Sequence, residues 1–547
     1  MALAVAGGLL TTLSFPDVGL WPGAPLGVGL LYLALRRDSA RWNALLGFLW
    51  GLVVHLPLLW WAYTSVGVVP WIALSAAVAG FQAATGALWT WWRRWRPQWR
   101  AESWARCRSR WLDPVAFTTL WVAAEQLRTV WPFGGFPWGR LAFSQTGSPL
   151  LGLAWLGGAP LVTGVVVLVG ALLAEAWLAL RRRARLAAVL GSATAVLLVV
   201  VGLTVPLDTA AEHGTLRVGV VQGNVPGQGL DAFGRRWQVL ENHVDGTRAL
   251  LDQAAPGDLD MVLWPENGSD VDPQVDPAAA EMVDAAAEAV AAPLLVGTVQ
   301  YPASGGRYNT TVVWQPGVGV VDQYSKQHPA PFAEYVPLRS LVRPFSSAVD
   351  LVSQDMLAGT EPGVVRVDAA RLDRTVDVGV VICFEVAYDD LVSGAVTHGG
   401  EILVVQTNNA SFGWTAESTQ QLAMTQFRAV EHGRAAVQVS TVGVSAVVAP
   451  DGTVTERTDL FTADQIVATL PLRTSTTPAT WLGPWPGRAA VLATLAAIVV
   501  VATSALWRRT RHHGHTDGTA DGTPEGDAAT ACQDDRQHDD DGRSPAP

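Results

Sequence analysis

Long apolar segments fill the first 210 residues of the chain, and shorter apolar runs alternate with polar ones after that. After a short first segment at 1–13, which we expect to be a helix as well, they lie at about 22–36, 43–63, 68–92, 112–131, 150–180 and 186–206, and one more follows at 489–507. A run of about 20 apolar residues is long enough to cross a bilayer as a helix. The pattern therefore predicts a membrane domain over residues 1–210 with seven transmembrane helices and an eighth over residues 486–508.

Residues 211–485 have the alternating pattern of an α/β domain. Short runs rich in valine predict strands at 216–222, 259–264, 294–299, 309–314, 318–323, 376–382, 402–406, 436–440 and 444–449. Helices are expected at 236–254, 277–291 and 415–433. This alternation favours a largely buried sheet covered by helices. Residues 509–547 are acidic and poor in large apolar side chains, so we expect a disordered tail there.

The composition supports a membrane protein that carries a soluble domain. Half of the 547 residues are hydrophobic and 16% are charged, whereas soluble domains contain roughly 25% charged residues. The net charge of −11 gives no indication of a nucleic-acid partner, because proteins that bind nucleic acids carry basic surfaces.

Arginines gather in every second loop of the predicted membrane domain. They are Arg36, Arg37 and Arg41, then seven between Arg93 and Arg110, then Arg181, Arg182, Arg183 and Arg185, and finally Arg508, Arg509 and Arg511. Cytoplasmic loops carry the excess of basic residues in membrane proteins. Both termini are therefore expected in the cytoplasm and residues 211–485 on the outer face of the cell membrane.

The predicted exported domain contains a single cysteine, Cys383, directly after the strand at 376–382. Taken alone, a cysteine at a strand end is as consistent with core packing as with a nucleophile. Cys107 and Cys532 fall in segments expected to be cytoplasmic, so Cys383 has no disulfide partner in its own domain. An unpaired thiol outside the cytoplasm favours the nucleophile.

Two other strand ends carry reactive groups. Glu266 follows the strand at 259–264, and the only lysine of the chain, Lys326, follows the strand at 318–323. Strand ends converge on one edge of an α/β sheet, where such folds place their sites. Glu266 could then take a proton from the Cys383 thiol and Lys326 could stabilise an oxyanion. Alone, Glu266 is better explained as a turn or cap residue.

The sequences around these three residues resemble the nitrilase superfamily, whose members share an αββα sandwich and a Glu-Lys-Cys triad. The matching motifs are WPE ending at Glu266, YSKQH around Lys326 and ICFE around Cys383. Further motifs are QGN at 222–224, PFAEYVP at 331–337 and TNNASFG at 407–413. Together with the predicted helices, they resemble the apolipoprotein N-acyltransferase family over roughly residues 1–507.

The resemblance implies a reaction and roles for particular residues. An acyl chain would pass from a phospholipid to Cys383 as a thioester, and then to the α-amino group of the N-terminal diacylglyceryl-cysteine of an apolipoprotein. Glu266 would be the general base and Lys326 would support the oxyanion. Glu334 and Glu385 match positions that the family needs and are expected to hold Lys326 and shape the nucleophile pocket, although Glu385 could serve only as a helix N-terminal carboxylate. The resemblance implies no metal and no cofactor.

Four residues are candidates for substrate binding: Phe384, Tyr335, Trp138 and Asn408. Phe384 stands where the family often has tyrosine, so a hydroxyl contact is expected to be missing. Trp138 belongs to the aromatic segment 131–145, which forms either an interfacial aromatic belt or the mouth through which a lipid enters.

Two features keep two interpretations each. Glu125 and Arg128 are three residues apart on one predicted helix and form either a functional pair at membrane depth or an ion pair that packs helices. The segment 338–357 is either an amphipathic lid or an ordinary loop.

Two other functions compete with acyl transfer. A membrane-anchored amidase of the nitrilase type would use the same triad but would need no entrance for lipids. A non-catalytic membrane partner of a lipid-modifying enzyme would not need the triad, and the presence of Glu266, Lys326 and Cys383 argues against it.

Overall fold

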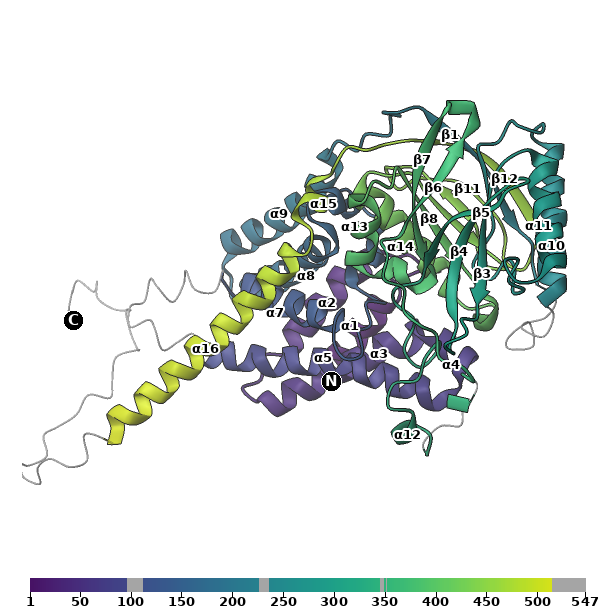
Figure 1. Ribbon diagram of the computed structural model, residues 1–547. Helices are drawn as coiled ribbons and strands as arrows, with labels where there is room; N and C mark the ends of the chain where they lie inside the picture. The colour runs from purple at the N-terminus through teal and green to yellow at the C-terminus, as the bar shows by residue number, and fades with distance from the viewer. Residues whose placement is uncertain (96–111, 226–235, 345–348, 351, 514–547) are drawn as a thin grey trace, which may run out of the picture. The chain divides into compact units, whose positions relative to one another are not determined.

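Apolar helices form the first part of the structure, a computed structural model that describes residues 1–95, 112–225, 236–344, 349–350 and 352–513 (Figure 1). These helices are α1 (Ala2–Thr12), α2 (Gly23–Ala34), α3 (Ala40–Leu58), α4 (Trp60–Val66), α5 (Val68–Trp95), α7 (Leu112–Arg128), α8 (Ala154–Arg181) and α9 (Arg185–Val201). The short 3-10 helices η2 (Leu141–Gln145) and η3 (Pro149–Leu153) lead into α8.

Length and apolarity identify fewer membrane spans than the eight predicted. Within the described ranges, four helical segments are long and apolar enough to cross a membrane, at 68–95, 149–181, 185–204 and 485–503. The helices α3 and α4 meet at 59° and would together make a fifth. The helices α1 and α2 are apolar but have only 11 and 12 residues. The number of eight spans is therefore not confirmed.

The bend between α3 and α4 has a local cause in Pro57. Proline has no amide hydrogen, so the Val53 carbonyl loses the donor that would close its helical turn. The hydroxyl of Thr12 donates to that carbonyl instead, at 3.2 Å. The helix α3 ends one residue after the proline, and the bend that follows lines one side of a groove described below.

Two six-stranded mixed sheets form the α/β domain. The first has the order β12-β1-β2-β3-β4-β5 and the second β11-β10-β9-β8-β7-β6. The strands are β1 (Thr215–Gln222), β2 (Met261–Leu263), β3 (Leu294–Gln300), β4 (Tyr308–Gln315), β5 (Gly319–Ser325), β6 (Val364–Ala369), β7 (Arg374–Ile382), β8 (Ile402–Thr407), β9 (Ala436–Ser440), β10 (Ala446–Val448), β11 (Val454–Arg457) and β12 (Asp464–Pro471). Three neighbours run parallel in each sheet: β1, β2 and β3 in the first, and β7, β8 and β9 in the second.

The two sheets pack face to face and each is covered by helices on its outer face. Val220 and Leu263 of the first sheet share one core with Val380 and Val404 of the second. The helices α10 (Arg236–Ala249) and α11 (Pro277–Val290) cover the first sheet. The helices α13 (Asp389–Thr397) and α14 (Glu417–His432) cover the second. The result is the αββα sandwich that the resemblance implies, visible in Figure 1.

All nine predicted strands and three predicted helices of this domain are present. Within the described residues, three strands and three short helices were missed, the helices being α12 (Arg339–Val342), α13 and α15 (Pro478–Leu482). The missed strands β6 and β12 bury only alternate residues. Polar side chains at every second position break up the apolar run that marks a buried strand. The third missed strand, β11, is four residues long and largely exposed. The missed helices α12, α13 and α15 are only four, nine and five residues long.

Two predicted segments fall partly outside the described residues. The last helix, α16 (Trp485–His513), continues past the end expected at residue 508, and residues 514–547 of the predicted tail are not described. The proposed lid at 338–357 contains the one-turn helix α12 (Arg339–Val342), but residues 345–348 and 351 are not described. The lid therefore stays a prediction.

The helical part and the sandwich share one hydrophobic core. Side chains of η2, η3 and α8 belong to the same buried cluster as side chains of α14 and β8. Phe143 of η2 meets Phe427 of α14 edge to face, with ring centres 5.4 Å apart. This packing brings the loop that precedes η2 onto the second sheet, next to the end of β7.

Candidate active site

Glu266, Lys326 and Cys383 are brought together at the ends of three strands, as their positions in the sequence predict. Glu266 lies in the turn after β2, Lys326 directly follows β5, and Cys383 directly follows β7. The Lys326 ammonium lies 3.6 Å from a Glu266 carboxylate oxygen. Both charges act on the Cys383 thiol, with opposite effects on its pKa.

The carboxylate of Glu266 is buried but well supplied with donors. The side-chain amide of Asn309 donates to one oxygen at 2.5 Å and the backbone N–H of Asn408 to the other at 2.8 Å. Burial raises the pKa of Glu266, and the Lys326 ammonium opposes that shift. Because both hydrogen bonds favour the ionised form, the carboxylate is equipped to accept a proton.

Lys326 is enclosed between two carboxylates and is only 1% exposed. Its ammonium donates to Glu334 at 2.8 Å, and the second Glu334 oxygen accepts from the Ala330 N–H at 2.6 Å. Burial alone would lower the pKa of Lys326, but Glu334 and Glu266 outweigh it and the pKa is raised. Lys326 therefore carries a fixed positive charge beside the thiol.

Cys383 occupies a sharp turn, the 3-10 helix η9 (Cys383–Ala387). Its φ of 54° is left-handed, a conformation that costs non-glycine residues free energy and is common at functional sites. Burial raises the pKa of the thiol, the Glu266 charge raises it further, and Lys326 lowers it. The resting form is therefore a neutral thiol that needs a base. Cys107 and Cys532 lie outside the described residues.

The fully buried carboxylate of Glu385 ties two strand ends together. One of its oxygens accepts from the Gln327 and His328 N–H groups at 2.7 and 3.1 Å, and the other from the Ile382 N–H at 2.8 Å. The hydroxyl of Tyr324 donates to both oxygens, at 3.0 and 2.9 Å. Glu385 thus holds the backbone just after Lys326 and just before Cys383. It serves a turn N-terminus as well, so both earlier interpretations describe part of its contacts.

The four residues predicted to bind substrate have different surroundings. Trp138 stacks on Phe384 with planes 3° apart and centres 5.4 Å apart, and its indole N–H donates to Gln420 at 2.7 Å. The partly buried Tyr335 hydroxyl reaches the Phe133 carbonyl at 3.5 Å. Asn408 gives its backbone N–H to Glu266.

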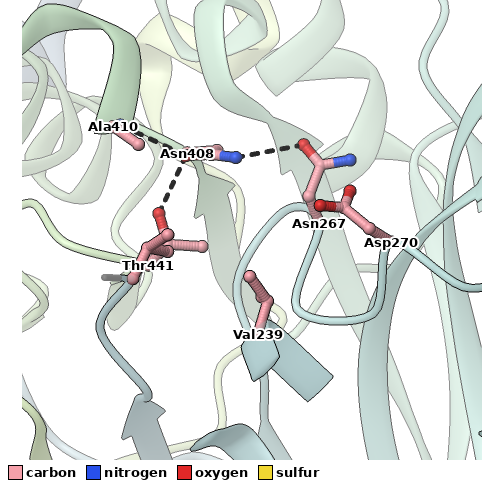
Figure 2. A pocket seen from close by; sticks show the side chains of 7 residues that line it. Val239, Asn267, Asp270, Asn408, Ala410 and Thr441 are labelled. Atoms are coloured by element: carbon pink, nitrogen blue, oxygen red, sulfur yellow. Dashed lines mark hydrogen bonds between the residues drawn. The ribbon is translucent and has the colours of Figure 1, made fainter. Parts of the chain in front are cut away.

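Figure 2 shows a small cavity beside the side chain of Asn408. Thr441 and the Ala410 N–H donate to the amide oxygen of Asn408 at 2.9 and 3.2 Å, and its NH₂ group donates to Asn267 at 3.4 Å. The cavity has a volume of about 10 Å³, which accommodates about one water molecule. It is too small for an acyl chain or a peptide, so the site needs another entrance.

A larger groove of about 590 Å³ lies where the bend between α3 and α4 meets the start of α14. Its lining includes Leu56, Trp60, Trp61, Trp71 and Trp414. From the groove, Trp61 contacts Trp138 with ring centres 5.3 Å apart, and Trp138 stacks on Phe384 beside the thiol. A row of contacting aromatic rings therefore extends from the groove beside the bent helix to the residue that follows Cys383.

Two polar residues of the site were not selected from the sequence. Asn309 follows the first residue of β4, and nothing local distinguishes it from other polar residues of a strand. Glu417 begins α14, and Asn409 donates to its carboxyl group at 2.6 Å. Burial raises the pKa of Glu417 to about 8, and the charge of Glu266 adds to this effect. An acidic residue in a first helical turn is so common that its position gave no signal.

The raised pKa of Glu417 predicts a pH dependence of stability that glutamine removes. The folded protein keeps a proton on Glu417 between pH 4.5 and about 8 that the unfolded chain has lost. Its contribution to stability is therefore complete at low pH and is lost as the pH rises towards about 8. When thermal denaturation is measured across this pH range, the melting temperature of Glu417→Gln should change less with pH than that of wild type. Equal changes of the melting temperature with pH in both proteins would contradict the raised pKa of Glu417.

Comparisons with known proteins extend over both parts of the chain. Residues 7–172 match the family model of the apolipoprotein N-acyltransferase N-terminal domain, and residues 217–477 match that of carbon-nitrogen hydrolases. The apolipoprotein N-acyltransferase of Mycolicibacterium smegmatis is 37% identical over 527 residues, covering 91% of this chain and 84% of that protein. That of Azotobacter vinelandii is 33% identical over 481 residues, covering 84% of this chain and 87% of that protein.

Part of the chain also aligns with solved structures. Saccharomyces cerevisiae Nit3, of the nitrilase superfamily, aligns with a TM-score of 0.36 and 15% identity, covering 48% of this chain and 93% of that one. The sequence matches, which extend over most of the chain, confirm the resemblance inferred from the motifs. They show that the chain belongs to the apolipoprotein N-acyltransferase family.

Proposed function

We propose that this protein N-acylates lipoproteins at the membrane by way of a thioester on Cys383. The donor is a phospholipid, and the acceptor is the α-amino group of the N-terminal diacylglyceryl-cysteine of an apolipoprotein. The arrangement of Glu266 and Lys326 around Cys383 carries the proposal, because it supplies a base, a cation and a nucleophile at one buried point.

In the first half of the reaction, Glu266 takes the thiol proton and the thiolate attacks the acyl ester of the phospholipid. Lys326 and backbone N–H groups stabilise the oxyanion of the tetrahedral intermediate. When the C–O bond breaks, Glu266 returns the proton to the leaving alkoxide, and a lysophospholipid departs. The acyl chain is then held by Cys383 as a thioester.

In the second half, the neutral amine of the acceptor attacks the thioester carbonyl. Glu266 takes a proton from the nitrogen as the C–N bond forms, and it passes that proton to the thiolate when the C–S bond breaks. The covalent intermediate allows two bulky lipids to use one site in turn. Glu266 ends each cycle as a carboxylate and Cys383 as a thiol.

The surroundings of the site favour a lipid substrate over the small amide of the alternative. A groove lined by tryptophans lies between the bent apolar helix and α14, and aromatic rings connect it to Phe384. An amidase acting on a small amide would have no use for such a groove. We further propose that both termini are cytoplasmic and that the sandwich faces outward, as the arginines of alternate loops favour.

The test is a complete reaction with purified full-length protein in detergent. Wild type should convert a diacylglyceryl peptide with a free amino terminus into its N-acylated form when phosphatidylethanolamine is present, as followed by mass spectrometry. Cys383→Ala should form no product. Release of ammonia from a small amide, with no acylated peptide, would favour the amidase instead.

A further inference from the structure

The loop before η2 wraps around the turn that carries the nucleophile. Residues 129–140 are called the α7–η2 loop here, and Cys383–Asp389 the nucleophile turn. Trp138 and Phe136 both pack on Phe384, with ring centres 5.4 and 5.6 Å apart. The Tyr388 hydroxyl donates to the Gly135 carbonyl at 3.1 Å. These contacts join the helical part of the chain to the residues that follow Cys383.

An ion pair closes this contact at the far end of the turn. One nitrogen of Arg140 lies 2.7 Å from both carboxylate oxygens of Asp389. From the opposite side, Arg428 of α14 donates to the Val386 and Ala387 carbonyls, both at 2.8 Å, and to Asp389 at 2.9 Å. Asp389 is therefore shared by two buried arginines, one from each part of the chain.

The α7–η2 loop is itself fixed to α7. Arg128 donates to the Phe136 and Trp138 carbonyls at 3.0 and 2.6 Å. Glu125 accepts from the Leu141 N–H at 3.2 Å and lies 3.4 Å from Arg140. Glu125 also accepts from the Thr163 hydroxyl of α8 at 2.7 Å. Of the two interpretations left open for Glu125 and Arg128, the packing of helices therefore describes part of these contacts, and binding of the loop is the other part.

The backbone conformation of Cys383 explains why these contacts to the nucleophile turn are useful. A left-handed φ at a non-glycine residue costs roughly 1–3 kcal/mol and persists only where the surroundings hold it. Glu385 holds the backbone before the thiol at Ile382, and Arg428 holds the carbonyls after it. The ion pair to Arg140 carries this support across to the membrane helices.

We propose that Arg140 is a positioning residue, which acts through Asp389 to hold the Cys383 thiol in place beside Glu266 and Lys326. The α7–η2 loop is then neither only an aromatic belt nor only a lipid mouth. Through this loop, the position of the Cys383 thiol depends on the membrane helices. Catalysis therefore requires that the sandwich is packed correctly against them. The inference about acyl transfer rests on the proposed function, but the positioning of the thiol does not.

The test compares Arg140→Gln with a matched control, Arg374→Gln. Arg374 pairs with Glu401 at 2.7 Å at the opposite end of the same strand, β7. Both variants are made in full-length protein carrying Cys107→Ser and Cys532→Ser, so that Cys383 is the only thiol. Three quantities are measured: the melting temperature, the rate of Cys383 alkylation by iodoacetamide, and the rate of acylation by a labelled phospholipid.

Arg140→Gln is expected to lower both rates by about tenfold or more, because small displacements of reacting groups cost rates of this order. Arg374→Gln should keep both rates near wild type. The melting temperature measures only folding stability. If both variants lower it by a similar amount and only Arg140→Gln slows the two reactions, lost stability does not explain the slower rates. An Arg140→Gln alkylation rate within twofold of wild type, or above it, would overturn the proposal.

A second variant keeps the test decisive if Arg140→Gln does not fold. Arg140→Lys retains the charge, but its single ammonium group cannot bind Asp389 and Glu125 together as the forked guanidinium of arginine does. It should fold and lower alkylation by about threefold to tenfold, and an unchanged rate would overturn the proposal. If the parent protein is alkylated at Cys383 but never acylated by phospholipid, the proposed function fails while the positioning of the thiol is still measured.

Discussion

Replacing Glu266 with glutamine is expected to slow acylation of Cys383 by roughly 10²–10⁴-fold, the usual contribution of a general base. Glutamine has nearly the same shape and keeps an oxygen that can accept from Asn309 or Asn408. It cannot accept the thiol proton. Because burial and the Glu266 charge raise the pKa of the thiol, few molecules would carry a thiolate without this base. Single-turnover acylation by a labelled phospholipid measures the effect.

A matched carboxylate-to-amide change provides the control. Asp284→Asn alters a carboxylate of α11 that accepts from the Trp314 indole and the Gly317 N–H, both at 2.9 Å. Trp314 lies near the end of β4 opposite to Asn309. That variant should acylate at the wild-type rate. If Glu266→Gln also stays within tenfold of wild type, the base lies elsewhere and the assignment of Glu266 is wrong.

Replacing Lys326 should affect both activity and stability. Lys326→Met leaves Glu266 and Glu334 close together in a buried site without their shared cation. Breaking a buried ion pair from one side costs about 3–5 kcal/mol, and the loss of oxyanion stabilisation lowers the acylation rate by roughly 10²–10³-fold. Lys326→Arg keeps the charge, but the planar guanidinium is larger and should lose most of the activity as well.

Chemical denaturation and single-turnover acylation of the Lys326 variants measure these two effects separately. Arg374→Gln, which removes one partner of a less buried pair, shows how much of the lost stability is specific to the site. Acylation by Lys326→Met within tenfold of wild type would reduce Lys326 to a structural partner of Glu334.

The pattern of apolar and polar residues predicted those strands and helices whose signal lies within a few consecutive positions. Buried strands such as β7 and β8 are continuous apolar runs, and the residues that follow them are readily identified. The convergence of Glu266, Lys326 and Cys383 could be predicted because their strands belong to an α/β sandwich, whose strand ends meet at one edge. Strands with alternating burial, such as β6, gave a weaker signal.

Contacts between distant segments could not be predicted in the same way. Nothing in the aromatic segment 131–145 indicates that Trp138 stacks on Phe384, or that Arg140 pairs with Asp389. Charge spacing on α7 singled out Glu125 and Arg128 but not their partners, which lie in the following loop and, for Glu125, also on α8. The eight membrane spans predicted from hydropathy are also not confirmed, because α1, α2 and α7 have only 11, 12 and 17 residues.

The most direct test of the whole account is to look for the acyl group on Cys383. Full-length protein in detergent is incubated with a phospholipid labelled in its acyl chain, beside Cys383→Ala. The account predicts label on denatured wild type that neutral hydroxylamine releases, that a diacylglyceryl peptide discharges, and that the variant lacks. Label retained equally by Cys383→Ala, or neither retained label nor released fatty acid with wild type, would contradict it.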